Sequence, residues 1–399
     1  MTMIEEEHND HNVQETMTSS TSLFKAMVAS EALTGESHVT VDDEGLFFDD
    51  LFVPYCRVLS ISYEDVTVDI TTQDDMFRVD LLGDMAGPFF KALCESFNAK
   101  IQKVLLARGR MLLEMRGPDY AYEDRVGYAC VRVFEDAVML LAPNMDARRI
   151  PFVFVSNVKE DADRVIVSLA NGERYTFSDL GDDQSTFVRL IREGIQRMQK
   201  LFAVSIGKLL PKLNHEQRVL VARVFPEGIC FPLVSKAPFP ELVARLEGIF
   251  RKSDVGVYYD RMFSLLDENK RAMGFKSLST KGDDASFVLW SLFPSLDGRY
   301  AVLEFAYPNE RAATYVFDTD GDFDRFLMTF NRAFESAGFN RELLYLSDEA
   351  LLLPSHTNNR MLLRRTPSLQ KLRALYRGRV VHRSLKSWSE RLRALLEVE

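Results

Sequence analysis

The strongest constraint on the fold is a pattern that occurs three times along the chain: an aromatic-rich strand, a Gly-Asp turn and a helix led by phenylalanine. The three turns are Gly83-Asp84, Gly181-Asp182 and Gly321-Asp322. The apolar stripes that follow them are Phe89, Leu93 and Phe97; then Phe187, Ile191 and Ile195; then Phe326, Phe330 and Phe334. Each of these positions in the first copy recurs 98 residues later in the second, whereas the third copy is displaced further and its stripe begins one residue sooner. This constant offset predicts two copies of one structural unit and a third, more divergent copy.

The residues around each turn predict the elements of the unit. Alternating aliphatic residues precede the first two turns: Val66, Val68 and Ile70, and Val165, Val167 and Leu169. Alternation with a period of two is typical of strands with one buried face. The stripes after the turns recur every four residues, which places them on one side of a helix. Each unit is therefore predicted to consist of antiparallel strands closed by one C-terminal helix.

The aspartates of the turns also admit an interpretation as metal ligands. Asp318, Asp320, Asp322 and Asp324 place carboxylates at every other position, as in part of a calcium loop. No glutamate follows at the required distance with a flanking pair of helices, so the structural interpretation is preferred. In that interpretation glycine allows a positive φ and aspartate favours the N-terminus of the next helix. His8 and His11 have a spacing that binds metal weakly, but no cysteine lies near them, and no metal or other cofactor is predicted.

Composition places the chain among ordinary globular proteins. Its 399 residues are 46% hydrophobic and 27% charged, which leaves room for two to four domains. No apolar run approaches the roughly 20 residues of a membrane helix, and three glutamates rather than basic residues follow Met1–Ile4. The four cysteines, Cys56, Cys94, Cys130 and Cys230, form no CxxC pair. Reduced core cysteines of this kind are typical of the cytoplasm, which is the predicted location.

Charge is distributed unevenly. The net charge is −10, but residues 360–399 contain eleven Lys or Arg against three Glu, which leaves −18 on the remainder. The acidic body disfavours nucleic-acid binding, whereas the basic tail suits an anionic partner, a membrane surface or the protein's own acidic face. The candidate residues for an anionic partner are Arg364, Arg365, Lys371, Arg373, Arg377, Arg379, Arg383 and Lys386.

The pattern along the chain predicts six segments. They are a mostly disordered acidic tail (1–36), a first repeat (37–106), a second repeat (107–205), a helical connector (206–281), a third, divergent repeat (282–340), and a hairpin with a basic helical tail (341–399). Helices are expected at Leu23–Leu33, Glu216–Val224 and Pro240–Phe250. At the C-terminal end, Leu343–Leu353 is expected to form a hairpin, and Leu369–Leu396 one helix or two helices broken near Gly378.

The layout of the repeats resembles the pleckstrin-homology-like (PH-like) superfold. The resemblance covers His38–Met198 and, less closely, Asp283–Phe334, and it implies an α+β fold of tandem PH-like units with a helical insert and a basic helical tail. Two phrases, Val53-Pro54-Tyr55 and Arg174-Tyr175-Thr176-Phe177, are similar to tandem domains of histone-chaperone subunits, which convergence explains equally well.

The same resemblance implies which classes of ligand the chain could bind. Members of the superfold that bind phosphoinositides have a basic cluster between their first two strands. The corresponding loop of the first repeat is the acidic Phe48-Asp49-Asp50, and the second repeat offers only Arg148-Arg149, which is interpreted as a solvated turn. Lipid-headgroup binding is therefore disfavoured. The superfold's other common use is to hold peptides or partner proteins at the sheet edge and helix groove.

These observations favour a non-enzymatic, cytoplasmic interaction or scaffold protein that binds other proteins or itself. The sequence contains no G-x-S-x-G, GxxxxGK, H-E-x-x-H or GxGxxG motif, so no catalytic residue is predicted. One alternative is peripheral binding to anionic membranes by the basic tail, with Leu372, Leu375, Tyr376, Leu385 and Trp388 facing lipid. A further alternative is nucleic-acid or histone-chaperone-like binding through the tail arginines, although no reading motif is present. The sequence does not identify the partner.

Overall fold

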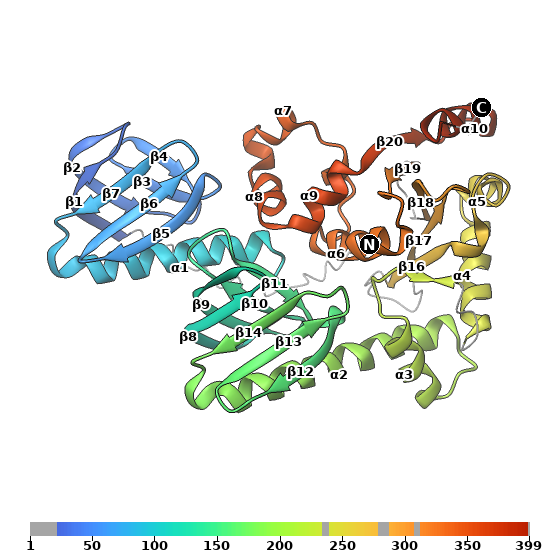
Figure 1. Ribbon diagram of the computed structural model, residues 1–399, viewed down its shortest axis with the longest axis horizontal. Coiled ribbons are helices and arrows are strands. Elements are labelled where there is room, and N and C mark those ends of the chain that lie inside the picture. Colours follow the sequence, from blue (N-terminus) through green and yellow to red (C-terminus); the bar gives the residue numbers. More distant parts are fainter. Residues whose placement is uncertain (1–21, 234–238, 278–286, 307–311, 398–399) are drawn as a thin grey trace, which may run out of the picture. The chain divides into compact units, whose positions relative to one another are not determined.

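The computed structural model describes residues 22–233, 239–277, 287–306 and 312–397 (Figure 1). Its described residues form a mixed α+β protein with three antiparallel sheets and ten α-helices. The chain divides into two compact units, with the boundary between Lys100 and Ile101. The first unit contains one sheet and the second contains two.

The first unit is a seven-stranded sheet followed by one long helix. The strands are β1 (Ser22–Ala29), β2 (Thr34–Val41), β3 (Gly45–Phe48), β4 (Leu51–Pro54), β5 (Val58–Glu64), β6 (Thr67–Thr72) and β7 (Met76–Asp80). Their order in the sheet is β4-β3-β2-β1-β7-β6-β5. Helix α1 (Ala86–Val104) lies along one face of this sheet (Figure 1).

The second sheet repeats the first strand for strand. Its members are β8 (Met111–Tyr122), β9 (Arg125–Phe134), β10 (Ala137–Leu141), β11 (Arg148–Pro151), β12 (Val155–Glu160), β13 (Arg164–Leu169) and β14 (Arg174–Ser178). Their order is β11-β10-β9-β8-β14-β13-β12, which is the order of the first sheet with every number raised by seven. Helix α2 (Gln184–Leu209) covers one face. The predicted pair of equivalent units, each closed by a helix, is confirmed.

The two Gly-Asp turns have the same backbone conformation. Gly83 and Gly181 have φ values of 55° and 54°, a left-handed conformation that glycine adopts without steric cost. Each glycine opens a single 3₁₀ turn that leads into the closing helix. Asp84 and Asp182 lie in these turns, where a negative charge favours the helix N-terminus without a capping hydrogen bond in the described residues. The stripes beyond them are buried at Phe89, Leu93, Phe97, Phe187 and Ile191, with Ile195 half-buried.

The third sheet is assembled from distant parts of the chain. Its strands are β15 (Phe231–Pro232), β16 (Ala272–Ser277), β17 (Phe287–Pro294), β18 (Tyr300–Ala306), β19 (Ala313–Asp318) and β20 (Tyr376–Val381), in sequential order. The helices of this region are α3 (His215–Val224), α4 (Pro240–Lys252), α5 (Gly256–Met262), α6 (Phe323–Ser336), α7 (Asp348–Leu351), α8 (Thr357–Arg365), α9 (Pro367–Ala374) and α10 (Leu385–Leu395). The expected helices at Glu216–Val224 and Pro240–Phe250 are therefore confirmed.

Both faces of the third sheet are covered. Trp290 and Phe305 contact Phe334 of α6 on one face, at ring-centroid distances of 6.0 and 5.3 Å. On the other face, Phe293 contacts Tyr259 of α5 at 5.7 Å. Every residue of β17 and β18 is buried, which explains why these strands lack alternating polar residues.

The third Gly-Asp turn also leads into a helix, and here the aspartate is a cap. The side chain of Asp322 accepts a hydrogen bond from the Arg325 N–H at 3.0 Å and so caps α6. Asp318 accepts from the Asp320 N–H at 2.8 Å. These carboxylates are thus engaged by the backbone around the turn.

Two predictions near the N-terminal end are wrong. Residues 22–29 form β1 rather than a helix, because Phe24, Ala26 and Val28 are buried while their neighbours Leu23 and Met27 are exposed. The strand pairs with β2 from Ser22↔Val41 to Ala29↔Thr34, so residues 22–36 belong to the first sheet and not to a disordered tail. The expected weak metal pair, His8 and His11, lies outside the described residues.

Two predictions near the C-terminal end are also wrong. Leu343–Leu353 is not a hairpin: the Ser347 hydroxyl accepts from the Ala350 N–H, and this cap starts the short helix α7. The basic tail is not only helical either. Between α9 and α10 lies β20, which pairs with β19 from Ala313↔Val381 to Phe317↔Tyr376 and so completes the third sheet. The sheet provides hydrogen bonds for the backbone around Gly378, where a helix is weakest.

Candidate functional site

A groove lies between strand β12 and helix α2. Its volume is about 690 Å³. Its apolar side chains come from the segment before β12, from β12 and from α2: Phe152, Val153, Val155, Val158, Ile195, Met198 and Phe202. Ala222, Arg223, Pro226 and Glu227 close the end near α3.

Strand β12 is an edge strand, since β13 is its one partner among the strands that the structure describes. The Val158 carbonyl lies on the open side, because it accepts a hydrogen bond from Nη2 of Arg192 on α2 at 3.2 Å. In an antiparallel strand the N–H and C=O of one residue point the same way, so the Val158 N–H also faces the groove. An edge of this kind offers backbone donors and acceptors to a further strand.

The charges along the groove are unequal. Arg192 and Arg223 are exposed. The Glu227 carboxylate is engaged, because it accepts hydrogen bonds from the N–H and the hydroxyl of Ser277 at 2.7 and 2.6 Å. The groove therefore has an apolar floor, and the exposed Arg192 and Arg223 give its rim a positive charge.

Several of the eight tail cations predicted from the sequence contact the protein's own acidic residues. Lys371 pairs with Asp320 at 3.3 Å, and Arg373 pairs with Asp348 at 2.9 Å. Arg377 pairs with Glu397 at 2.6 Å. These pairs lie at the surface, where solvent screening keeps their contribution to stability small.

The remaining candidates have different surroundings. Arg379 lies over the ring of Tyr345, 3.7 Å from its centroid. Arg365 is buried, Arg364 is half-buried, and Arg383 and Lys386 are exposed. Among the described residues, Arg383 and Lys386 form no ion pair, and the eight residues do not converge on one site.

The apolar residues of the tail are largely buried. Leu372 and Trp388 are 0% and 1% exposed, and Leu375 is 9% exposed. Tyr376 is half-buried, whereas Leu385 remains 40% exposed. Trp388 belongs to the core on the α5 side of the third sheet.

The interpretation of Arg148-Arg149 as a solvated turn is wrong. Both residues lie in β11 and are 8% exposed. Arg149 forms ion pairs with Asp136 at 2.5 Å and with Glu335 of α6. Strand pairing to β10 holds them in the sheet, and the carboxylates offset the cost of burying the Arg149 charge.

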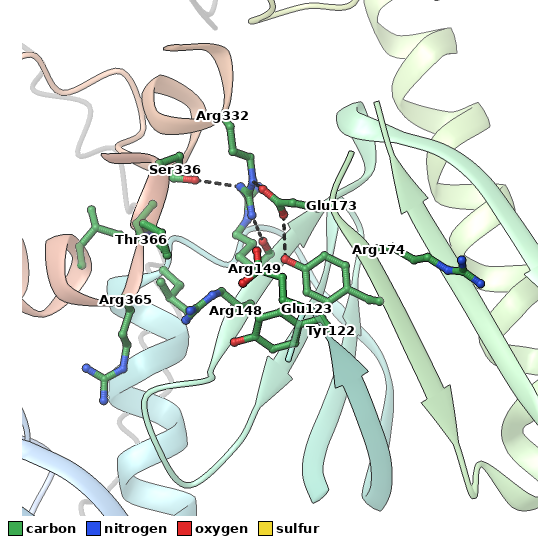
Figure 2. Close-up of a pocket in the computed structure, with 15 residues that line it drawn as sticks. Tyr122, Glu123, Arg148, Arg149, Glu173, Arg174, Arg332, Ser336, Arg365 and Thr366 are labelled. Carbon is green, nitrogen blue, oxygen red and sulfur yellow. Dashed lines mark hydrogen bonds and ion pairs between the residues drawn. The ribbon is translucent and has the colours of Figure 1, made fainter. Parts of the chain in front are cut away.

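Next to Arg149 lies a network that sequence reasoning missed. Arg332 of α6 donates from Nε to Glu173 at 3.0 Å, from Nη1 to Ser336 at 2.8 Å and from Nη2 to the Arg149 carbonyl at 2.7 Å (Figure 2). Glu173 also accepts from the Tyr175 hydroxyl at 2.8 Å. The residues of this network come from strand β11, the turn before β14 and helix α6, which are far apart in the chain. No local sequence pattern therefore predicts the network.

Burial and charge shift the titration of this network. Burial alone would raise the pKa of Glu173, but the Arg332 charge and the hydrogen bonds of Tyr175 and Asn171 outweigh it, so the pKa is lowered. Burial and the neighbouring Glu173 charge raise the pKa of Tyr175 well above its ordinary value. The carboxylate thus stays ionised and the phenol stays protonated at neutral pH.

The residues that the structure describes provide no group of three or more His, Cys, Asp or Glu side chains suited to hold a metal ion. Within 22–233, 239–277, 287–306 and 312–397, no helix combines the length and apolar character needed to cross a bilayer. Burial raises the pKa of the Cys130 and Cys230 thiols.

Comparison with known proteins adds no relative: no protein-family model and no curated protein matches this chain.

Proposed function

We propose that this chain is a non-enzymatic, cytoplasmic interaction protein built from tandem PH-like units, and that the groove between β12 and α2 holds an extended segment of a partner protein. The PH-like assignment is supported by the shared strand order of the first two sheets and by the helix that closes each. Two equivalent units without a recognisable catalytic motif suit a scaffold better than an enzyme.

One observation carries the proposal: an unpaired strand edge borders an apolar groove of about 690 Å³. A partner segment that displaces Arg192 from the Val158 carbonyl can pair with β12 through main-chain hydrogen bonds, and its alternate side chains reach the apolar floor. Arg192 and Arg223 favour an acidic residue in that segment. The occupant is therefore an extended segment that combines apolar residues with a carboxylate.

A displayed library of random twelve-residue peptides, selected on the immobilised full-length chain, tests this proposal. The expected result is enrichment of peptides in which apolar residues alternate and at least one Asp or Glu is present. A synthetic peptide of the enriched sequence is then titrated, and hydrogen exchange is followed in β12. The amides of β12 that face the groove, such as that of Val158, are expected to gain protection when the peptide is bound, whereas the amides that face β13 should change little.

Two substitutions on α2 serve as a matched pair. Met198 lines the groove, whereas Leu201, three residues further, is 66% exposed and does not line it. Met198→Glu is expected to weaken peptide binding at least tenfold, and Leu201→Glu to leave it unchanged. Equal binding by both variants, or peptide protection outside β12, would contradict the proposal; peptides that match the chain's own sequence would identify a second copy as the partner.

Binding of the basic tail to membranes or nucleic acids remains a prediction. The exposed Arg383 and Lys386 are compatible with either, but burial of Trp388 and Leu372 leaves few apolar residues for insertion into lipid.

A further inference from the structure

A second cavity lies where β11, α6 and the start of α9 meet (Figure 2). Its volume is about 80 Å³, enough for several water molecules or one small ion. The rings of Tyr122 and Tyr175 form part of its wall. Its charged lining residues are Arg148, Arg149, Arg174, Arg332, Arg365, Glu123 and Glu173.

The lining carries a surplus of positive charge, with five arginines against two glutamates. Partners within the protein account for part of this charge, since Arg332 binds Glu173 and Arg149 binds Asp136 and Glu335. Those pairs explain why Arg332 and Arg149 are buried. They do not explain Arg148, whose charge has no carboxylate partner among the described residues.

Arg148 is 8% exposed and has donors to spare. Its Nη1 donates to the carbonyl oxygens of Met145 and Ala147, both at 2.9 Å. Its Nε and Nη2 have no hydrogen-bond partner in the described part of the chain. Nε of Arg149, in a side chain that is also 8% exposed, has no partner either. These donors line a cavity and lack a protein acceptor, which leaves them available to a bound acceptor such as water or an anion.

The start of α9 adds one backbone donor at the same cavity, the Ser368 N–H, because Pro367 has no N–H and the Thr366 N–H donates to the Leu363 carbonyl at 3.3 Å. Thr366, Pro367 and Ser368 line it, and Pro367 occupies the first position of the helix. The first N–H groups of a helix lack intrahelical partners, and the helix dipole makes this end positive. A helix N-terminus beside a guanidinium is a favourable place for an oxyanion.

We propose that this cavity binds a phosphate group, with Arg148 and the first turn of α9 as its ligands. The tetrahedral oxyanion accepts the forked Nε and Nη2 donors of Arg148 and neutralises the surplus positive charge. Arg332 acts as a positioning residue, because its hydrogen bonds to the Arg149 carbonyl and to Glu173 hold α6 against β11 and the turn before β14 and so shape the wall. The phosphate is either free in solution or part of a small phosphomonoester or lipid headgroup.

Isothermal titration of the full-length chain with inorganic phosphate, against sodium chloride at matched ionic strength, tests the site. One saturable site is expected, together with a higher melting temperature in phosphate. Arg148→Gln is expected to weaken binding at least tenfold, and Arg148→Lys to weaken it less, because lysine keeps the charge but loses the fork. Arg189→Gln is the charge-matched control, because Arg189 of α2 is exposed and does not line the cavity.

Two further probes distinguish a soluble phosphomonoester from a lipid headgroup as the source of the phosphate. Methyl phosphate represents a soluble phosphomonoester, and phosphatidylcholine vesicles with a phosphatidylinositol phosphate represent a headgroup. Competition of either probe with inorganic phosphate, lost in Arg148→Gln, supports the site and names its source. The proposal is overturned if the wild-type chain shows no saturable phosphate binding, or if Arg148→Gln binds phosphate as tightly as Arg189→Gln does.

Discussion

Nε of Arg332 donates to Oε1 of Glu173 across 3.0 Å, although 159 residues separate the two in the chain. Arg332 belongs to the helix that packs on the third sheet, and Glu173 precedes β14 of the second sheet. The side chain of Arg332 is 7% exposed and that of Glu173 is 26% exposed. The pair therefore joins two sheets within the second unit, and unfolding one sheet would leave a charge of the other uncompensated.

Replacing this arginine tests how far the two sheets depend on each other. Arg332→Met is expected to lower the free energy of unfolding by about 3 kcal/mol, because Glu173 loses its partner while it retains partial access to water. Urea denaturation followed by tryptophan fluorescence measures the change. Both tryptophans, Trp290 and Trp388, lie in the second unit, so the signal reports on that unit.

The control for this variant is Arg189→Met, which removes an exposed pair with Glu193. A loss of less than about 0.5 kcal/mol is expected there. In the double variant Arg332→Met with Glu173→Gln, part of the stability should return, since the buried negative charge is also removed. Equal losses in Arg332→Met and Arg189→Met would show that the buried pair does not couple the sheets.

The lowered pKa of Glu173 predicts a dependence of stability on pH. A carboxyl whose pKa is lower in the folded state stabilises the protein above its unfolded pKa of about 4.3 and loses this contribution as pH falls through the folded value. The wild-type chain should therefore be more stable than Glu173→Gln above about pH 5, and the difference should shrink below pH 4.3. Urea midpoints from pH 3 to 7 measure it, and a difference that grows on acidification would refute the assignment.

Two helical glycines should respond in opposite directions to substitution by alanine. A Cβ at Gly194 of α2 would lie 2.3 Å from Cε2 of Phe152, a buried ring that also lines the β12–α2 groove. Gly194→Ala is expected to destabilise the second unit by about 1–3 kcal/mol, since the ring must move in a packed core. A Cβ at Gly248 of α4 would meet no atom within 4 Å, so Gly248→Ala should stabilise it by about 0.5–1 kcal/mol. Urea denaturation of the two variants side by side checks both signs.

The sequence predicted those parts of the fold whose signals are local. Gly83 and Gly181, with the stripes that follow, were enough to identify two equivalent units because turn chemistry and helix periodicity act over a few residues. The sequence did not predict strand β20 because its pairing partner, β19, lies about 60 residues earlier in the chain. The outward residues of β20 are arginines, and this basic stretch was interpreted as a helix. Leu23–Val28 was missed because Leu, Ala and Met favour helices, and only the sheet shows which face is buried.

The candidate sites were less predictable than the fold, and for the same reason. Arg149 looks like a surface residue until Asp136 and Glu335 are placed beside it, 13 and 186 residues away in the chain. The groove depends on β12 being an edge strand, which is a property of the sheet order and not of Val155–Glu160. Sites whose residues are brought together by long-range strand pairing have no fixed sequence spacing, so a motif search does not detect them.

A buried polar cluster on the third sheet gives the last prediction. Thr314 of β19 donates to Oε2 of Glu304 at 2.5 Å and accepts from Nε1 of Trp388 at 2.7 Å, and His382 lies within 3.2 Å of the same carboxylate oxygen. Thr314 and Glu304 are both 0% exposed. The Thr314 hydroxyl therefore links a buried carboxylate of the third sheet to Trp388 of α10.

Thr314→Val keeps the volume but removes the hydroxyl, so the Trp388 N–H loses its acceptor and Glu304 loses a donor. The free energy of unfolding is expected to fall by about 2–4 kcal/mol, because two buried polar groups lose a partner. The emission of Trp388 should also change in the folded protein. Thr329→Val is the control: its hydroxyl donates to the Arg325 carbonyl on an exposed helix turn, and a change within about 0.5 kcal/mol is expected. If both variants unfold at the same urea concentration as the wild type, the hydroxyl of Thr314 does not hold α10 in place.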